Sequence, residues 1–499
     1  AIVYVLTGTT TNGFFKLSSS KKQAILLNGV SITNPNGAAI NVQSGKRTFV
    51  VVEGSNTLSD GSSASYSTGN DEDMKAVFFS EGQLVFSGSG SLTVKAQNKQ
   101  GKSGIVSDDY VRLMSSPTIN ITSGSSAGHG LRGKDFVQVS SGTLEISTLA
   151  AAKKGIGSDD YVLVEGGTTT IAVSGGVTYD SDEKDYKGSA GIKADNYFAM
   201  TGGSVTITNT GTGGKGIRAG SYDYDETNHT LTDSYISGGN LTITTTGSES
   251  NGVSSKGIKI GYKEATSGSG RNASYKYAGN MTVSGGTIVV KVSKSEGFEV
   301  KGKLTFTGGD TYVYSTGDDA INSQGEMNIN GGYVCGISTQ NDAIDCNSNL
   351  KINGGYVYAV TTKGSPEVAI DANTEGGYKL YINSGATIVA YGGLENGSSI
   401  SQACYTMSVS SGGYNTINNS SGKAIAVFKA PSNISSMVVT APSMASAAKG
   451  VSISGGTAHT EGLWIDQPTV SGGSSASLST YSGGNGGPGQ GGGPGGGRW

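Results

Sequence analysis

The chain has 499 residues, of which 82 are glycine and only 8 are proline, so it is neither collagen-like nor a polyproline linker. Its net charge is −3, and no long block of basic residues indicates a nucleic-acid-binding arm. No apolar run reaches the length of a membrane span. Charged residues make up only 15%, and hydrophobic residues come in short alternating bursts, which predicts an all-β protein.

The first element is a short edge strand at residues 1–6, and a repeat of roughly 23 to 26 residues follows it. Each copy contains a small residue followed by an aliphatic or aromatic one. The clean copies are Gly104-Ile105, Gly130-Leu131, Gly155-Ile156, Gly191-Ile192, Gly216-Ile217, Gly257-Ile258, Gly297-Phe298, Ala320-Ile321, Ala343-Ile344 and Ala369-Ile370. Two or three short strands fit in each copy, which predicts one coil of a parallel β-helix. A glycine pair, as at Gly202-Gly203, opens a strand in many copies and permits positive φ at a corner.

The repeat is clearest in residues 317–360. Asp319-Ala320-Ile321-Asn322 recurs as Asp342-Ala343-Ile344-Asp345, 23 residues later. Equivalent positions in a β-helix stack at the spacing of paired strands, about 4.8 Å. We therefore predict that Ile321 and Ile344 are neighbours on adjoining parallel strands.

Three insertions are expected to leave the coils as loops from one region: Tyr179–Lys187, Tyr222–Ile236 and Tyr262–Ala278. The rhythm fails near residue 373, and a small β-rich C-terminal module is expected to cap the last coil. The predicted domains are a parallel β-helix with N-terminal cap strands (1–372), the last coil with the module (373–470) and a Gly-rich tail (471–499).

Several strings resemble one bacterial family, among them KGIGSDDYVLVEGGTTTI, GDDAINSQGEMNINGG and, in the module, AVFKAPSNISSMVVTAPSM. The family comprises secreted carbohydrate-binding β-helix proteins once catalogued only as a domain of unknown function, and the N-terminal sequence is similar to members from gut-type Bacteroidetes. The resemblance implies a right-handed parallel β-helix, bound calcium and plant cell-wall polysaccharides, including acidic pectin-type chains. It also implies a secreted protein, extracellular or on the cell surface.

The residue that follows each repeated aliphatic position forms a predicted column of charge. In the middle coils it is Lys193, Arg218 and Lys259, three cations at one-coil spacing that suit the carboxylates of a polyuronate chain. The alternative is that they are solvated corner residues that keep the protein soluble.

Carboxylates gather at the coil corners: Asp318, Asp319, Asp342 and Asp345 in the later coils, and Asp159 and Asp160 in the earlier ones. Stacked carboxylates repel one another unless a cation bridges them, and Ca²⁺ takes six to eight oxygen ligands. We therefore predict metal sites here. Asx-turns at the corners are the alternative reading.

Tyrosines form a second repeated feature in the later coils. We expect the side chains of Tyr333 and Tyr356 to point outward and to stack on each other, with Tyr312 and Tyr358 on the same face. An exposed ladder of rings offers apolar faces to sugars. Packing under a loop or against another subunit is the alternative.

The sequence thus predicts a non-catalytic, calcium-dependent protein that binds polysaccharide. One alternative is a subunit of an extracellular filament, a homopolymer that assembles through the ends of the coil stack and the Gly-rich tail. A second alternative is a pectate-lyase-like enzyme, because those enzymes share the coil architecture. His129, His229 and His459 are scattered, so no Ser-His-Asp set is indicated.

Overall fold

The computed structural model describes residues 2–67, 72–222, 224, 230–268 and 274–483. It is an all-β protein with large parallel sheets, as predicted, and antiparallel strands near the C-terminus. Two compact units divide the chain, Ala1–Asn280 (unit 1) and Met281–Trp499 (unit 2). Most of the Gly-rich tail (484–499), His229 and parts of two predicted insertions (223, 225–229 and 269–273) lie outside the described residues.

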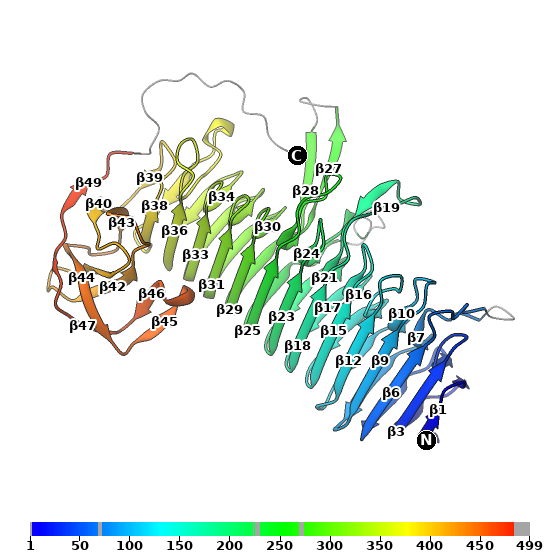
Figure 1. Ribbon diagram of the computed structural model, residues 1–499. Helices are drawn as coiled ribbons and strands as arrows, with labels where there is room; N and C mark the ends of the chain where they lie inside the picture. The colour runs from blue at the N-terminus through cyan, green and yellow to red at the C-terminus, as the bar shows by residue number, and fades with distance from the viewer. Residues whose placement is uncertain (1, 68–71, 223, 225–229, 269–273, 484–499) are drawn as a thin grey trace. The chain divides into compact units, whose positions relative to one another are not determined.

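Unit 1 consists of two stacks of parallel strands (Figure 1). Sheet A contains β1 (Ile2–Thr10), β3 (Gln23–Asn34), β5 (Thr48–Glu53), β6 (Ser55–Asp60), β8 (Leu84–Gly88), β9 (Ser91–Ala96), β11 (Val111–Leu113), β12 (Thr118–Ser123), β14 (Phe136–Val139), β15 (Thr143–Thr148), β17 (Tyr161–Val164), β18 (Thr168–Val173), β22 (Phe198–Met200), β23 (Ser204–Asn209) and β25 (Ser234–Thr245). Sheet B contains β2 (Phe15–Ser18), β4 (Ile40–Gln43), β7 (Ala76–Ser80), β10 (Ser103–Ser107), β13 (Leu131–Gly133), β16 (Lys154–Ser158), β21 (Ala190–Ala194), β24 (Lys215–Ala219) and β26 (Lys256–Ile260).

The repeated small residue marks the closest approach of the two sheets. A Cβ atom on Gly216 would lie 2.3 Å from Cγ2 of Ile243 in sheet A and 2.6 Å from the carbonyl oxygen of Gly257. The aliphatic residue that follows is buried, as Ile217 and Ile258 show at 0% exposure each, and these two are register partners. Each such side chain contributes about 1.5–3 kcal/mol by burial. Close approach and burial together explain the Gly-Ile repeat.

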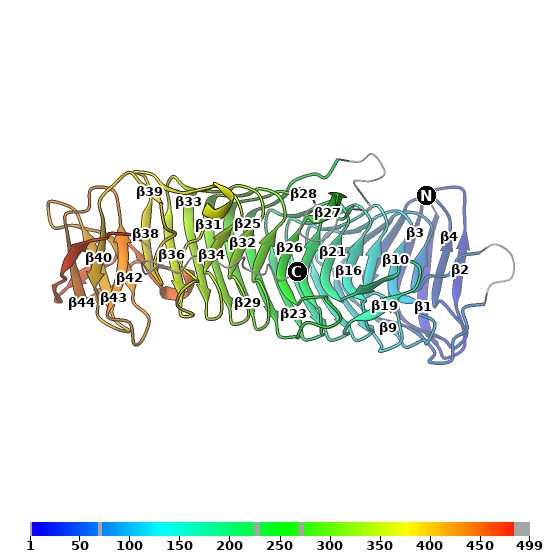
Figure 2. The ribbon, with the colours of Figure 1, turned by 90° about the horizontal axis from the view of Figure 1, so that it is seen from above.

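Two antiparallel hairpins leave unit 1 at opposite ends of the sheet B strands. β19 (Thr178–Asp180) and β20 (Asp185–Lys187) precede β21, whereas β27 (Tyr262–Ser267) and β28 (Ser274–Ala278) follow β26. Figure 2 shows β19 on one side of the row formed by β16, β21 and β26, and β27 with β28 on the other. The expectation that the insertions project from one region is therefore wrong for these two, because one precedes its sheet B strand and the other follows its own.

Unit 2 contains further parallel strands. Its sheet A contains β29 (Met281–Val292), β31 (Leu304–Ser315), β33 (Met327–Ser338), β35 (Leu350–Ile352), β36 (Tyr356–Thr361), β37 (Leu380–Ile382), β38 (Thr387–Tyr391) and β39 (Ser399–Ile400), and its sheet B contains β30 (Phe298–Val300), β32 (Ile321–Ser323) and β34 (Ile344–Cys346). Ile321 pairs with Ile344 in parallel register, which confirms that residues 23 apart lie side by side. Gly332 and Gly355, the second glycines of their pairs, have φ of +83° and +78°, which agrees with the predicted positive φ at the pair.

The C-terminal part of unit 2 is an antiparallel module. Its elements are β40 (Cys404–Ser408), β41 (Tyr414–Asn418), β42 (Ala424–Lys429), β43 (Ser436–Thr440), β44 (Ser446–Ser454), β45 (Thr457–His459), β46 (Trp464–Asp466), β47 (Thr469–Ser471), β48 (Ser474–Ser475) and β49 (Leu478–Thr480). Two short 3₁₀ turns, η2 (Thr374–Gly376) and η3 (Thr460–Gly462), complete the unit. β43 pairs antiparallel with β38, so the module continues sheet A of unit 2 and covers one of its edges.

Candidate functional site

A column of cations runs across the outer face of sheet B in unit 1. Lys193 pairs with Arg218, and Arg218 with Lys259, on adjacent parallel strands, which confirms the predicted alignment of these residues. The same column extends through Gly157 to Arg132. We call Arg132, Lys193, Arg218 and Lys259 the basic column. Gly157 leaves one gap in it.

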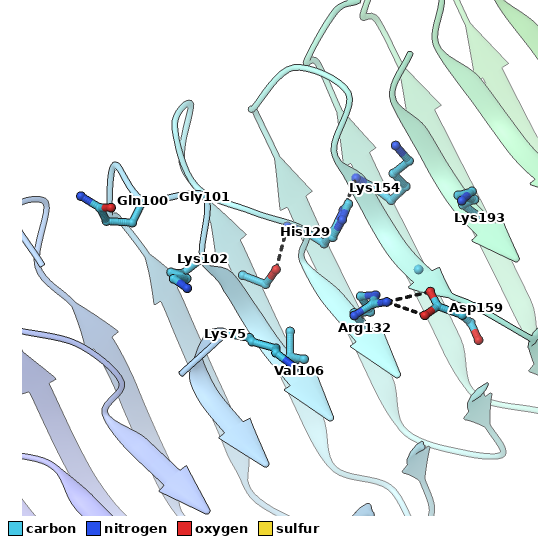
Figure 3. A pocket seen from close by; sticks show the side chains of 13 residues that line it. Lys75, Gln100, Gly101, Lys102, Val106, His129, Arg132, Lys154, Asp159 and Lys193 are labelled. Carbon is cyan, nitrogen blue, oxygen red and sulfur yellow. Dashed lines mark hydrogen bonds and ion pairs between the residues drawn. The ribbon is translucent and has the colours of Figure 1, made fainter. Parts of the chain in front are cut away.

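An open pocket of about 400 Å³ lies beside this gap (Figure 3). Five cationic side chains line it, with one carboxylate. The cations are Lys75, Lys102, Arg132, Lys154 and Lys193, and the carboxylate is Asp159. The pocket wall is therefore strongly positive, which suits an anionic ligand.

Acidic side chains at the next corner hold some of these cations in place. Arg132 Nη2 donates to both carboxylate oxygens of Asp159, at 2.7 and 2.6 Å. Lys193 Nζ lies 2.7 Å from Asp195 Oδ1. All four side chains are partly exposed, so solvent weakens the pairs and the cations stay accessible to a ligand.

Lys154 carries the clearest electrostatic signal in the pocket. Burial, and then the neighbouring cations Lys193 and Arg218, lower the pKa of Lys154 to about 7. Its backbone N–H donates to Nδ1 of the half-buried His129 at 3.0 Å. Burial and the surrounding lysines also lower the pKa of His129 well below its usual range, so this imidazole is neutral and adds no positive charge. Even without charge on His129 and Lys154, the other four cations outnumber the one carboxylate of the pocket, Asp159.

A carboxylate cluster occupies the equivalent face of unit 2. Glu299, Asn322 and Asp345 are successive register partners on β30, β32 and β34. Oxygen atoms of Asp342, Asp345 and Asp371 lie within 4.8 Å of one another. Burial raises the pKa of each of these three carboxyls to about 7.

Asn322 links this cluster to Asp319. Its Nδ2 donates to Asp319 Oδ2 at 2.9 Å and to Asp345 Oδ2 at 2.6 Å, while its Oδ1 is buried without a hydrogen-bond partner among the described residues. Asp318 instead accepts from Asn341 Nδ2 at 2.7 Å. An unpaired amide oxygen beside several carboxylates is the donor set that a hard cation such as Ca²⁺ prefers, so these residues fit the implied metal.

The earlier pair of predicted metal ligands lies in different surroundings. Asp159 binds Arg132, and Asp160 accepts from Asn196 Nδ2 at 2.8 Å. Within the described ranges, neither joins a carboxylate group like the one in unit 2. Their role as ligands stays a prediction.

The tyrosines of unit 2 are aligned as predicted but are covered. Tyr333 and Tyr356 stack at 4.8 Å with 8° between their planes. Tyr312, Cys335 and Tyr358 occupy one register column, and Tyr358 is 0% exposed, with its hydroxyl donating to the carbonyl of Lys429 at 2.7 Å.

The predicted exposure is therefore wrong for Tyr358, because the C-terminal module packs over it; Tyr312, Tyr333 and Tyr356 are half-buried against the same core. Their role in sugar binding stays a prediction.

Comparison with known proteins is consistent with a glycan-binding all-β protein. A family described as carbohydrate-binding domain-containing protein matches residues 1–150, 148–334 and 276–459. The matches span most of the chain, so the chain belongs to this family, which supports the predicted polysaccharide partner. One similar solved structure is a gadolinium derivative of a polysaccharide lyase-like protein from C. thermocellum. Its sequence is 22% identical and the TM-score is 0.36; the aligned region covers 44% of this chain and 83% of that chain. No curated protein gives a significant match.

Sequence reasoning missed several residues of these sites. Arg132 follows the repeated Leu131, so the rule that found Lys193 also identifies it. Lys75 lies at another position and gave no repeat signal. Lys154 directly precedes the repeated Gly155-Ile156, as Lys215 and Lys256 precede their own pairs, so a repeat signal was present in the sequence and was not used. Burial and a hydrogen bond with Asp371 raise the pKa of Glu395 to about 8, but this residue lies beyond the point where the rhythm fails. No helix in the described part of the chain is long and apolar enough to cross a membrane.

Proposed function

We propose that the protein is a secreted polysaccharide-binding protein that holds acidic, pectin-type chains along the basic column without cleaving them. One observation carries the proposal: four cations share one register column, beside a half-buried lysine whose pKa is lowered to about 7. Cations so close together repel one another, and a chain of carboxylates offsets that repulsion. Uronate carboxylates also accept hydrogen bonds from the Arg132 and Arg218 guanidinium groups.

The proposed track follows from the pairing of the strands. Strands of sheet B repeat at about 4.8 Å, so the column presents a cation at nearly every coil along the stacking direction. A polysaccharide laid along that direction meets several cations at once, and weak contacts add up when they belong to one chain. The two hairpins, with the exposed Tyr179 and Tyr277, flank this face and supply side walls. We further propose that the coils form a right-handed parallel β-helix.

We also propose that Asp342, Asp345 and Asp371 hold calcium, with Asn322 as a neighbouring oxygen donor. A bound Ca²⁺ neutralises the carboxylates and so removes the cost of burying their charge. The metal would therefore stabilise unit 2, while the residues of unit 1 contact the glycan. Adding a chelator tests whether the bound metal affects glycan binding.

One observation favours a second candidate function, cleavage of the glycan by β-elimination. A lysine with a pKa of about 7 is suited to remove a proton from the carbon next to a carboxylate, and Lys154 lines the basic pocket. Incubation with polygalacturonate distinguishes the two functions. Unsaturated products that are absent with Lys154→Met would establish the lyase, and their absence from the wild type would support binding alone.

Affinity electrophoresis tests the main proposal. The protein is run in gels that contain polygalacturonate or a neutral glucan, each with calcium and with a chelator. We expect polygalacturonate to retard the protein, and we expect added salt to abolish that retardation, because the contacts are between partly exposed charges. Unretarded migration in the polygalacturonate gel under both conditions would contradict the proposal.

A further inference from the structure

Unit 2 contains a larger cavity that the basic column does not explain. Its volume is about 1070 Å³, the size of a small-molecule binding site. It lies between the stacked Tyr333 and Tyr356 of sheet A and the strands β42 and β46 of the C-terminal module. Its lining combines aromatic rings with amide, carboxylate and ammonium groups: Tyr333, Tyr356, Trp464, Asn418, Asp466 and Lys423.

Trp464 is the most informative residue of this lining. The side chain is only 1% exposed and packs edge-on against Tyr356 at 5.4 Å and Phe428 at 6.0 Å. Its indole Nε1–H has no hydrogen-bond partner within the described part of the chain. A buried donor without an acceptor costs about 1–3 kcal/mol. A ligand hydroxyl that accepts this hydrogen bond after a small shift of the lining would recover that cost.

The tyrosines present their edges rather than their faces. Tyr333 is covered on one side by Tyr356 and on the other by His459, whose ring lies 3.7 Å away and nearly parallel. His459 is itself held by Asp310, with 3.2 Å between Nδ1 and Oδ2. This stack holds the ring of Tyr333 in place before a ligand enters. Burial, together with the charge of Asp466, raises the pKa of both tyrosines, which stay protonated and able to donate.

The charge of the lining determines the class of ligand. Among the described residues that line it, the only ionisable groups apart from the tyrosines are one carboxylate, Asp466, and one ammonium group, Lys423. This balance contrasts with the five cations and one carboxylate of the pocket in unit 1. Hydrogen-bond donors and acceptors beside aromatic and aliphatic side chains suit the hydroxyl groups and C–H surface of an uncharged sugar.

We propose that this cavity is a second glycan site, which binds a neutral oligosaccharide through Trp464 Nε1–H, the tyrosine hydroxyls and the Asp466 carboxylate. The site does not depend on the basic column, so failure of one proposal leaves the other standing.

The chain has only two tryptophans, Trp464 and Trp499, which makes the site directly observable. In a Trp499→Phe full-length protein, Trp464 is the only source of tryptophan fluorescence. We expect its emission to change saturably when cellotriose or maltotriose is added, and not when trigalacturonate is added. An unchanged emission with both neutral sugars would overturn the proposal. So would an emission that changes on dilution of the protein alone, because a second protein copy would then occupy the cavity.

Two variants test the contacts in this background, with calorimetry as the common readout. Asp466→Asn retains the shape of the side chain but removes its charge, and we expect about tenfold weaker binding. Trp464→Phe keeps a ring but removes the N–H, and we expect a similar loss; its melting temperature checks that it folds.

The matched control in the same background is Lys22→Gln, an exposed lysine outside both proposed sites, which should leave the affinity for the neutral sugar unchanged. Equal binding by Asp466→Asn and its parent would overturn the site, as would loss of binding in the Lys22→Gln control. Affinity electrophoresis of Asp466→Asn on polygalacturonate should match the wild type, which separates this site from the track in unit 1.

Discussion

The two units place different chemistry at the same position of the repeat. The residue after the buried aliphatic one is a cation in unit 1, at Arg132, Lys193, Arg218 and Lys259, and an acid or amide in unit 2, at Glu299, Asn322, Asp345 and Asp371. Their burial differs as well. The side chain of Lys193 is 28% exposed, whereas Glu299 and Asn322 are 2% and 6% exposed.

This contrast shows how one backbone arrangement supports two uses. A partly exposed cation can release its own carboxylate partner and bind a carboxylate of a ligand instead. Water screens the charges of the cation in the free and in the bound protein, so the exchange costs little. Buried carboxylates have no such exchange with solvent and instead need a proton or a cation of their own. This one position of the repeat is therefore suited to a large external ligand in unit 1 and to a small ion in unit 2.

The largest effect is expected from reversing the charge of the column in unit 1. The triple variant Lys193→Glu, Arg218→Glu, Lys259→Glu should bind polygalacturonate about 100-fold more weakly, since each partly exposed pair contributes up to about 1 kcal/mol. Affinity electrophoresis or calorimetry measures this loss.

The control for this prediction makes the same change of charge elsewhere. Lys21→Glu, Lys22→Glu, Lys46→Glu replaces three exposed lysines on the early coils. An equal loss in both triple variants would mean that net charge, and not the column, determines binding.

The next effect concerns the column in unit 2. Asp345→Asn removes one charged ligand of the proposed ion, and we expect at least about tenfold weaker calcium binding. Titration of chelator-treated protein with calcium chloride gives the affinity. Asp182→Asn, an exposed aspartate in the β19–β20 hairpin, is the matched control and should bind calcium like the wild type. Calcium affinity unaffected by Asp345→Asn would place the ion elsewhere.

The pH dependence of the free energy of unfolding should distinguish unit 2 further from unit 1. In the folded chain the pKa of Asp342, Asp345 and Asp371 is about 7, against an ordinary value of 3.8. Between about pH 4 and pH 7 these carboxyls lose their protons in the unfolded chain but keep them in the folded chain. Without calcium, their contribution to the free energy of unfolding is therefore complete below about pH 4 and falls as the pH rises towards 7. We expect a fall of at least about 1 kcal/mol in the free energy of unfolding.

Denaturant unfolding at pH 5 and pH 8 measures this change, with a chelator and with calcium. Calcium should restore stability mainly at pH 8, where its ligands are deprotonated. Asp345→Asn, which removes one of the buried acids, should show a smaller fall in the chelator series. A fall of the same size in this variant would show that other groups cause it.

The smallest effect is expected from filling the gap in the basic column. Gly157 lies between Arg132 and Lys193, and a Cβ atom there would have only Arg132 Cγ within 4 Å, at 4.0 Å. Gly157→Lys should therefore fit and tighten polygalacturonate binding by about threefold. Gly45→Lys adds the same charge at an open position away from the column and should have no effect. Weaker binding by Gly157→Lys would indicate that the ligand occupies the gap itself.

The sequence was sufficient to predict contacts between neighbouring coils. The pairing of Ile321 with Ile344, and the alignment of Lys193 with Arg218 and Lys259, follow from one rule about repeat length. The rule works because parallel strands in register convert sequence spacing directly into spatial adjacency.

Contacts made by the C-terminal module could not be predicted in this way. Tyr333 and Tyr356 lie next to His459 and Trp464, more than 100 residues further along the chain, where no repeat sets the register. β42 and β43 are consecutive strands, yet β42 pairs with β41 while β43 pairs with β38 and β40. Antiparallel pairing depends on turns and packing that act only in the folded chain.

Pairing in register limits how a chain of this kind can change in length during evolution. Gain or loss of a single residue inside a strand turns every later side chain of that strand to the opposite face, so buried isoleucines and outward charges would change places. Duplication of a whole segment such as residues 318–340 adds a coil that pairs on both sides and leaves existing neighbours unchanged. Such proteins can therefore lengthen in discrete steps, and each step can bring one more charge to the outer face.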